Sequence, residues 1–219
     1  MIAVDMPGFG RSPELAQTPT PWALGQAITR FCHELGVERP HVAGNSLGGW
    51  VALEIGKADA ASSLCLISPA GLWRTPLGAR NLDSRKWGKR LRPAIMGLTR
   101  IAPVREAMLR TSIGRPELVP AADGRAMIAA WIDAPGYAAA NAEMRRYVAE
   151  DLDRIAVPTT ILWGELDKLV GPPRPERRPP GTRYVQIPGL GHTPNWDDPD
   201  LISDLLLEAS APRAITSST

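Results

Sequence analysis

The stretch His41-Val42-Ala43-Gly44-Asn45-Ser46-Leu47-Gly48-Gly49-Trp50 carries the strongest signal for the fold of this 219-residue chain. It places Ser46 between Gly44 and Gly48, after a short apolar run and before a helix-like segment. A serine in a tight turn from a strand into a helix adopts strained backbone dihedrals, and side chains at the flanking positions would collide there. The pattern therefore indicates a serine at a helix N-terminus, where the Leu47 N–H can face a developing oxyanion.

The composition is that of an ordinary globular protein. Hydrophobic residues make up 44% and charged residues 22% of the chain, which is long enough for one α/β domain. The net charge of +2 favours neither nucleic acid nor an anionic membrane as a partner. Cys32 and Cys65 lie in apolar segments without metal-ligand spacing, so we expect buried free thiols in a reducing compartment. The sequence shows no secretory leader pattern and no run as long as a membrane span, so we expect a soluble, cytoplasmic protein.

Strand-like and helix-like segments alternate along much of the chain. Apolar runs predict strands at Met1–Asp5, His41–Gly44, Ser63–Ser68, Thr159–Trp163 and Arg183–Ile187. Apolar periodicity and capping signals predict helices from Pro21, capped by Thr20, to Gly36, from Trp50 to Lys57, and from Asp200 to Glu208. Strands and helices that alternate in units this short indicate a parallel sheet with right-handed crossovers.

The alternation stops between Pro69 and about Ala140. This segment is rich in Arg, Pro and Gly, has no strand pattern, and contains helical patches at Ala94–Arg110 and Asp123–Asp133. We therefore expect a mostly helical insertion at about residues 70–140 within a single domain that spans residues 1–219. A helix over Asn141–Ile155 is expected to lead back to the sheet, and Ala209–Thr219 is expected to form a frayed tail.

Three polar residues follow the carboxyl ends of separate predicted strands, namely Ser46, Asp167 and His192. In an open parallel sheet these ends line one crevice, where ligands bind. A neutral imidazole can take the proton of a serine hydroxyl, and a carboxylate fixes the imidazole tautomer and stabilises the imidazolium. The order Ser…Asp…His thus predicts a serine nucleophile, a histidine base and an aspartate that orients it, and no metal or organic cofactor is implied.

Four motifs stand in a defined order along the chain. They are Asp5-x-Pro7-Gly8-Phe9-Gly10-x-Ser12, Gly44-Asn45-Ser46-Leu47-Gly48-Gly49, Trp163-Gly164-x-x-Asp167 and Gly189-x-Gly191-His192-x-Pro194. Together they resemble the α/β-hydrolase fold superfamily, in its branch of lidded esterases, carbon–carbon bond hydrolases and related enzymes. The resemblance runs from Met1 to about Leu207 and implies an α/β fold, a mostly parallel sheet with flanking helices, and a small-molecule substrate. It is loosest over the helical insertion, which matches the position of the family's lid.

Other residues compete for roles in such a site. Glu165 lies two residues before Asp167, but the position in the family motif favours Asp167. Phe9, between two glycines, and Trp196, shortly after the predicted catalytic histidine, are possible residues of the substrate pocket, although packing is the more common role for such a tryptophan. Structural roles are expected for His33, His41 and Ser12.

The chain departs from the family pattern at its start. The first three strands of the family are missing, together with the His-Gly loop that supplies the second N–H of the oxyanion hole. This loss would leave backbone groups of Met1–Asp5 and His41–Gly44 unpaired, and the loss of one oxyanion donor lowers turnover by about a hundredfold to a thousandfold. Three explanations are open: the natural start lies upstream, the gene is a decayed remnant, or the two strands pair directly in a compacted sheet.

The leading functional hypothesis is a serine hydrolase that acts on a small carboxylic ester or a similar acyl compound, with the Leu47 N–H as the surviving half of the oxyanion hole. Dehalogenases and epoxide hydrolases of this fold carry an aspartate where this chain has Ser46, which argues against those activities. Asn45 also occurs in carbon–carbon bond hydrolases of ring-cleavage products, so that activity is the alternative. A truncated, non-catalytic scaffold that binds a ligand or partner is the third possibility, and the sequence predicts no oligomeric state.

Overall fold

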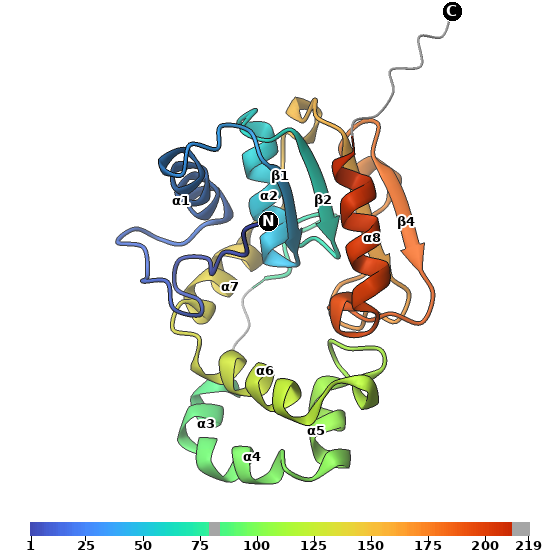
Figure 1. Cartoon of the computed structure of the whole chain (residues 1–219). Helices are drawn as coiled ribbons and strands as arrows, with labels where there is room; N and C mark the ends of the chain where they lie inside the picture. The colour runs from blue at the N-terminus through green and yellow to red at the C-terminus, as the bar shows by residue number, and fades with distance from the viewer. Residues whose placement is uncertain (79–83, 212–219) are drawn as a thin grey trace, which may run out of the picture.

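A four-stranded parallel sheet forms the centre of the protein (Figure 1). The computed structural model describes residues 1–78 and 84–211, except for the side chains of residues 84–86. The strand order is β1-β2-β3-β4, with β1 (His41–Asn45), β2 (Ser63–Ile67), β3 (Thr159–Gly164) and β4 (Arg183–Ile187). Each of these strands lies within one residue of its predicted bounds. The inner strands β2 and β3 are buried along their whole length, as expected for a parallel sheet that is covered on both faces.

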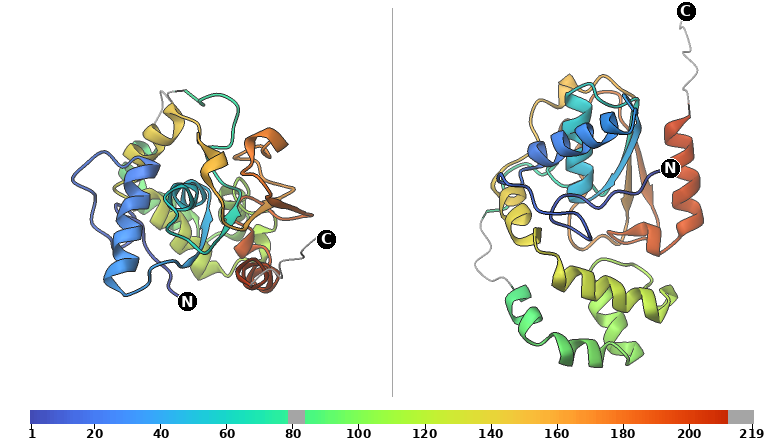
Figure 2. Two further views of the ribbon diagram at one scale, coloured as in Figure 1. Left: turned by 90° about the horizontal axis from the view of Figure 1, so that it is seen from above. Right: turned by 60° about the vertical axis from the view of Figure 1, so that its left-hand side comes forward.

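Helices cover the two faces of the sheet (Figures 1 and 2). Helix α2 (Leu47–Lys57) packs on one face, with α1 (Pro21–Glu34) beside it, and α8 (Pro199–Ser210) packs on the other. Alternate residues of β2 serve the two sides, because successive side chains of a strand point to opposite faces. Leu64 and Leu66 belong to the core on the α2 side, whereas Cys65 and Ile67 belong to the core on the α8 side.

The helical insertion predicted from the sequence gathers at one end of the sheet. Helices α3 (Ser84–Arg90), α4 (Arg92–Leu98), α5 (Ala102–Leu109) and α6 (Ala121–Asp133) lie within its predicted bounds of about residues 70–140, and α7 (Tyr137–Arg146) extends the insertion beyond them. The strand arrows in Figure 1 point toward these helices, so the insertion covers the carboxyl ends of the strands. Its buried apolar residues form a separate small core of Leu109, Ile113, Val119, Ile128 and Ile132.

The predicted strand at Met1–Asp5 is wrong. The segment forms no strand, and all five of its residues are exposed. An apolar run becomes a strand only when a neighbour accepts its backbone hydrogen bonds, and within the described residues β1 pairs with β2 alone. The direct pairing considered as one explanation for the short start is therefore not present, and β1 forms an edge of the sheet.

Two predicted helices also differ from the structure. The helix predicted at Ala94–Arg110 is divided into α4 and α5 ahead of Pro103, whose ring would clash with the carbonyl four residues earlier in a continuous helix. The helix predicted at Asn141–Ile155 instead begins at Tyr137 and ends at Arg146. The Ala149 N–H beyond this end donates to the Gly71 carbonyl at 2.8 Å, so a distant contact takes the bond that a longer helix would need.

Two further expectations concern the ends of the chain and the membrane. A frayed tail is predicted from Ala209. Helix α8 extends to Ser210, and the part of the predicted tail from residue 212 onward lies outside the described residues. Among the helices that the structure describes, none combines the length and the apolar character that a membrane crossing requires.

Candidate active site

Ser46 lies on a sharp turn between β1 and α2. Its backbone has φ 55° and ψ −116°, a conformation that costs a non-glycine residue about 1–3 kcal/mol. The turn is tight because a Cβ on Gly44 would collide with the Gly48 carbonyl. The Ser46 N–H donates to the Ile67 carbonyl at 2.9 Å, which fixes the turn on the neighbouring strand. Ser46 therefore stands at the start of α2, where the first N–H groups of the helix, that of Leu47 included, have no partner within the helix.

His192 and Asp167 form a buried hydrogen-bonded pair. The distance from His192 Nδ1 to Asp167 Oδ2 is 2.7 Å, and the two side chains are only 5% and 1% exposed. Asp167 follows β3 and His192 follows β4, so both come from loops at the carboxyl end of the sheet. The other oxygen of Asp167 accepts the N–H groups of Leu169 and Val170 at 2.8 and 3.0 Å. The three hydrogen bonds of this carboxylate thus orient the imidazole and fix its own loop.

The pKa of the Asp167 carboxyl reflects opposing influences. Burial raises this pKa, but the hydrogen bond and charge of His192 and the two backbone N–H groups outweigh burial and hold the pKa below its usual value. An ionised Asp167 only accepts hydrogen bonds, so Nδ1 of His192 carries the proton that they share. In the neutral imidazole, Nε2 is then free to act as a base.

Asn45 connects the serine turn to the histidine loop. Its side-chain amide donates to the Ile67 carbonyl at 3.0 Å and to the His192 carbonyl at 2.8 Å. These bonds bring the segments that carry Ser46 and His192 side by side, although the residues are 146 positions apart in the sequence. In the described part of the chain the Ser46 hydroxyl makes no hydrogen bond to the imidazole, and such contacts are often long before a substrate binds.

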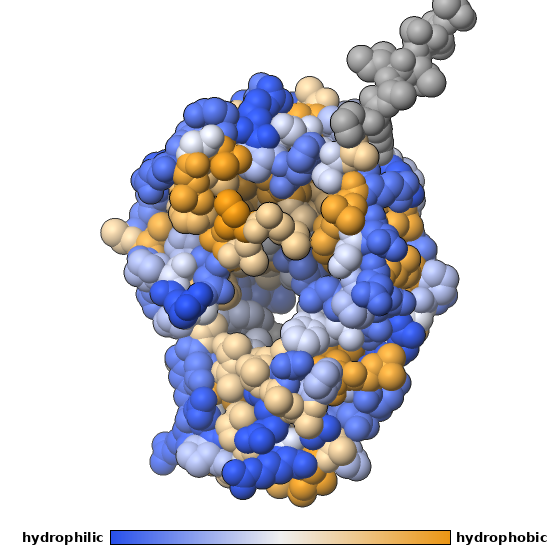
Figure 3. Space-filling view, in the orientation of Figure 1, coloured by the Kyte–Doolittle hydropathy of each residue, from blue (hydrophilic) through white to orange (hydrophobic). Residues whose placement is uncertain are grey.

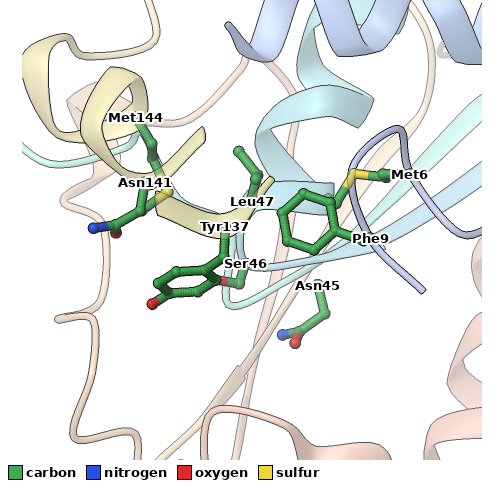
Figure 4. Close-up of a pocket in the computed structure, with 9 residues that line it drawn as sticks. Met6, Phe9, Asn45, Ser46, Leu47, Tyr137, Asn141 and Met144 are labelled. Carbon is green, nitrogen blue, oxygen red and sulfur yellow. The ribbon is translucent and has the colours of Figure 1, made fainter. Parts of the chain in front are cut away.

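A cavity of about 200 Å3 adjoins Ser46 (Figure 4). It lies where the surface is hollowed between the sheet and the helical insertion (Figure 3). Its walls combine apolar side chains with a few polar groups, from Met6, Phe9, Asn45, Ser46, Leu47, Gly48, Tyr137, Asn141 and Met144. Phe9, which the sequence offers as a possible residue of the substrate pocket, thus lines the cavity beside the serine.

The cavity includes residues that sequence reasoning missed. Tyr137, Asn141 and Met144 come from α7 and recur at spacings of four and three, so they share one face of this helix. This spacing could have indicated a shared helix face from the sequence, but the sequence does not show which helix of the insertion faces the serine. The Gly136 N–H, directly before α7, donates to the Gly8 carbonyl at 2.8 Å and fixes the start of this helix beside the Phe9 loop.

The sequence leaves Trp196 a choice between the substrate pocket and packing, with packing as the more common role. Trp196 is absent from the cavity lining and packs against the small core of the helical insertion. Its ring is wide enough to bridge the histidine loop and that core, so its role in the structure is packing.

The other polar candidates make local structural contacts. Glu165 accepts the N–H of Gly189 at 3.2 Å and does not reach His192. The Ser12 hydroxyl donates to the Asp5 carbonyl, and His41 shares a hydrogen bond with Ser63. The His33 imidazole lies 3.6 Å from the Glu38 carboxylate. Within residues 1–78 and 84–211, the structure shows no group of three or more His, Cys, Asp or Glu side chains placed to hold a metal ion.

A parallel sheet with a serine on a strand-to-helix turn, an aspartate and a histidine after later strands, and a helical insertion over the strand ends defines the α/β-hydrolase class. A model of the alpha/beta hydrolase family matches residues 1–205, and this chain belongs to that family. It is accordingly a hydrolase, and its sheet has four strands in the described residues.

Individual relatives agree with this assignment. The epoxide hydrolase EphH of Mycobacterium tuberculosis is 30% identical over 202 residues, which cover 84% of this chain and 91% of EphH. A thermophilic esterase from Thermogutta terrifontis shares the fold with a TM-score of 0.64 and 24% identity, over 93% of this chain and 76% of the esterase. A probable hydrolytic enzyme from Pseudomonas aeruginosa gives a TM-score of 0.70 and 24% identity, over 95% and 75% of the two chains.

Proposed function

We propose that this hydrolase cleaves small carboxylic esters or similar acyl compounds, with Ser46 as nucleophile, His192 as general base and acid, and Asp167 as the residue that orients His192. The observation that carries the proposal is the buried 2.7 Å bond between Asp167 and His192, on a loop that Asn45 ties to the strained turn of Ser46. A hydroxyl needs a neighbouring base before it becomes a good nucleophile, and an oriented imidazole meets that need.

The reaction proceeds in two acyl transfers. Ser46 Oγ attacks the ester carbonyl carbon while its proton passes to Nε2 of His192, and the Leu47 N–H stabilises the resulting oxyanion. The intermediate collapses to an acyl-serine, and the leaving alkoxide takes the proton from the imidazolium. Water then attacks the acyl-serine with the same proton transfers, which releases the carboxylic acid and restores the hydroxyl of Ser46.

The cavity favours short acyl groups. Its volume of about 200 Å3 lies below the ~300–1,000 Å3 of pockets that enclose drug-sized ligands. Met6, Phe9, Leu47 and Met144 give it apolar walls, and Tyr137, on the same helix as Met144, lies beside Ser46. In this proposal the helical insertion serves as a lid, because α7 closes the cavity over the serine.

The relative named as an epoxide hydrolase raises a competing activity. Attack on an epoxide by a serine oxygen would leave an ether on the enzyme, which water does not readily hydrolyse. A carboxylate nucleophile would instead leave an ester that water can cleave. Ser46 therefore favours acyl substrates. Carbon–carbon bond hydrolysis of ring-cleavage products is the second candidate, since the Asn45-Ser46 pair that holds the histidine loop also occurs in enzymes of that kind.

A substrate series tests the proposal. Hydrolysis of p-nitrophenyl acetate, butyrate and octanoate should be fastest for the shorter esters and should fall to background in Ser46→Ala and in His192→Ala. Turnover of a vinylogous 1,5-diketone in place of the esters would favour the second candidate. A folded protein that cleaves neither kind of compound above the rate measured with Ser46→Ala would contradict the enzymatic proposal and favour a binding scaffold.

A further inference from the structure

Asp197 is a buried carboxylate outside the proposed triad. The residue is 4% exposed, and its oxygens accept three backbone N–H groups. Oδ2 accepts those of Gly191 at 2.7 Å and Gly114 at 3.1 Å, and Oδ1 accepts that of Arg115 at 2.6 Å. Gly191 directly precedes His192, whereas Gly114 and Arg115 belong to the helical insertion. One carboxylate thus joins the loop of the catalytic base to the proposed lid.

Further bonds hold the same junction on the other side of His192. The Ser112 carbonyl accepts both the N–H and the hydroxyl of Thr193, at 2.9 and 3.0 Å. The Arg115 guanidinium donates to the Asp197 carbonyl at 2.9 Å and lies 3.6 Å from the Asp198 carboxylate. Thr193 is therefore bonded directly to segment 112–115, and Gly191 is linked to the same segment through the carboxylate of Asp197.

The two backbones also touch directly. A Cβ on Gly114 would lie 2.7 Å from the Gly189 carbonyl oxygen, and a Cβ on Gly191 would lie 2.8 Å from the backbone of Ile113. Because no side chain separates the segments, their relative position is set by the hydrogen bonds of Asp197 and Thr193. Loss of the carboxylate would leave buried N–H groups without an acceptor, and the segments would move apart to hydrate them.

We propose that Asp197 is a positioning residue, which holds the His192 loop against the helical insertion and thereby keeps the imidazole within reach of Ser46. The inference rests on the proposed triad. Asp167 fixes the imidazole at Nδ1, but the distance from the imidazole to the Ser46 hydroxyl also depends on the backbone position of residues 191–193. A misplacement of about 1 Å can reduce a catalytic rate by roughly a hundredfold.

Steady-state kinetics with p-nitrophenyl acetate test the role of Asp197. In Asp197→Asn, which keeps one acceptor oxygen, kcat should fall at least tenfold, and in Asp197→Ala it should fall further, with KM changed less than twofold. The matched control Asp204→Asn removes an exposed carboxylate from α8 and should leave both constants unchanged. A purely structural role predicts a lower Tm with an unchanged kcat at temperatures where the variant is fully folded, and that result would overturn the proposal.

Two additional measurements keep the outcomes distinct. If Asp197→Asn does not fold, the variant Thr193→Val can be measured in its place, because it removes only the hydroxyl bond from Thr193 to the Ser112 carbonyl. Its kcat should be lower than that of the native protein, and an unchanged kcat would count against the proposal. Backbone hydrogen exchange should accelerate in residues 112–115 and 191–193 together in Asp197→Asn, even if no ester is cleaved. If Ser46→Ala abolishes the esterase activity but Asp197→Asn does not reduce it, the proposed role of Asp197 is rejected and the proposed triad is retained. If the activity survives in Ser46→Ala, the triad itself is rejected.

Discussion

At the scale of single residues, Asp167 combines almost complete burial with a charge. A carboxylate in that position is stable only because His192 and two backbone N–H groups compensate for the lost hydration. The same interactions that hold the imidazole therefore also stabilise the folded state, and the two effects can be separated by their dependence on pH.

The Asp167→Asn variant should show this dependence. Because the pKa of Asp167 in the folded protein lies below its ordinary value of 3.8, the stability contributed by the ionised carboxylate is present above about pH 4 and is lost as the pH falls through the lower, folded pKa. Urea unfolding should show that the excess stability of the native protein over Asp167→Asn shrinks between pH 5 and pH 2.5. A difference that grows as the pH falls would contradict the direction of the pKa shift.

The two cysteines should differ in reactivity. Burial raises the pKa of the Cys65 thiol to about 12, against a smaller opposing effect of the Arg183 charge, whereas Cys32 on α1 is only partly buried. At pH 8 iodoacetamide should modify Cys32 in the native protein and Cys65 only after unfolding, as measured by intact mass. Rapid modification of Cys65 in a folded Cys32→Ser variant would show that the β2 core is open to solvent.

At the scale of secondary structure, the start of α1 provides a direct test of a capping contact. Thr20 Oγ1 accepts the Ala23 N–H at 3.1 Å, one of the donors that a helix cannot satisfy internally. Thr20→Ala should lower the free energy of unfolding by about 1 kcal/mol, whereas the control Thr18→Ala alters an exposed side chain and should have little effect. Equal urea midpoints for Thr20→Ala and the native protein would contradict the role of this cap.

The elements also show what local sequence can predict. Strands β2 and β3 were predictable because fully buried strands appear as apolar runs bounded by turn residues. Met1–Asp5 is just as apolar, but its state depends on whether a neighbouring strand is present, which no local pattern records. The end of α7 is similar, because the bond from Ala149 to Gly71 joins segments far apart in the sequence.

At the scale of the whole molecule, the site is assembled from distant segments. The order of Ser46, Asp167 and His192 after three separate strands was readable, since the carboxyl ends of parallel strands meet at one edge. The contribution of α7 to the cavity and the bonds from Asp197 to segment 112–115 were not readable, because each depends on how the helical insertion packs on the sheet. The sequence thus indicates the proposed reacting groups better than the surfaces that would select the substrate.

The central claim is that His192 and Asp167 activate Ser46, and covalent labelling with a fluorophosphonate tests it most directly. Peptide mass analysis should locate a single adduct on Ser46, with no labelling in Ser46→Ala and labelling slowed at least a hundredfold in His192→Ala. A folded protein that is not labelled at Ser46, or that is labelled there at the same rate without the imidazole, would contradict the claim.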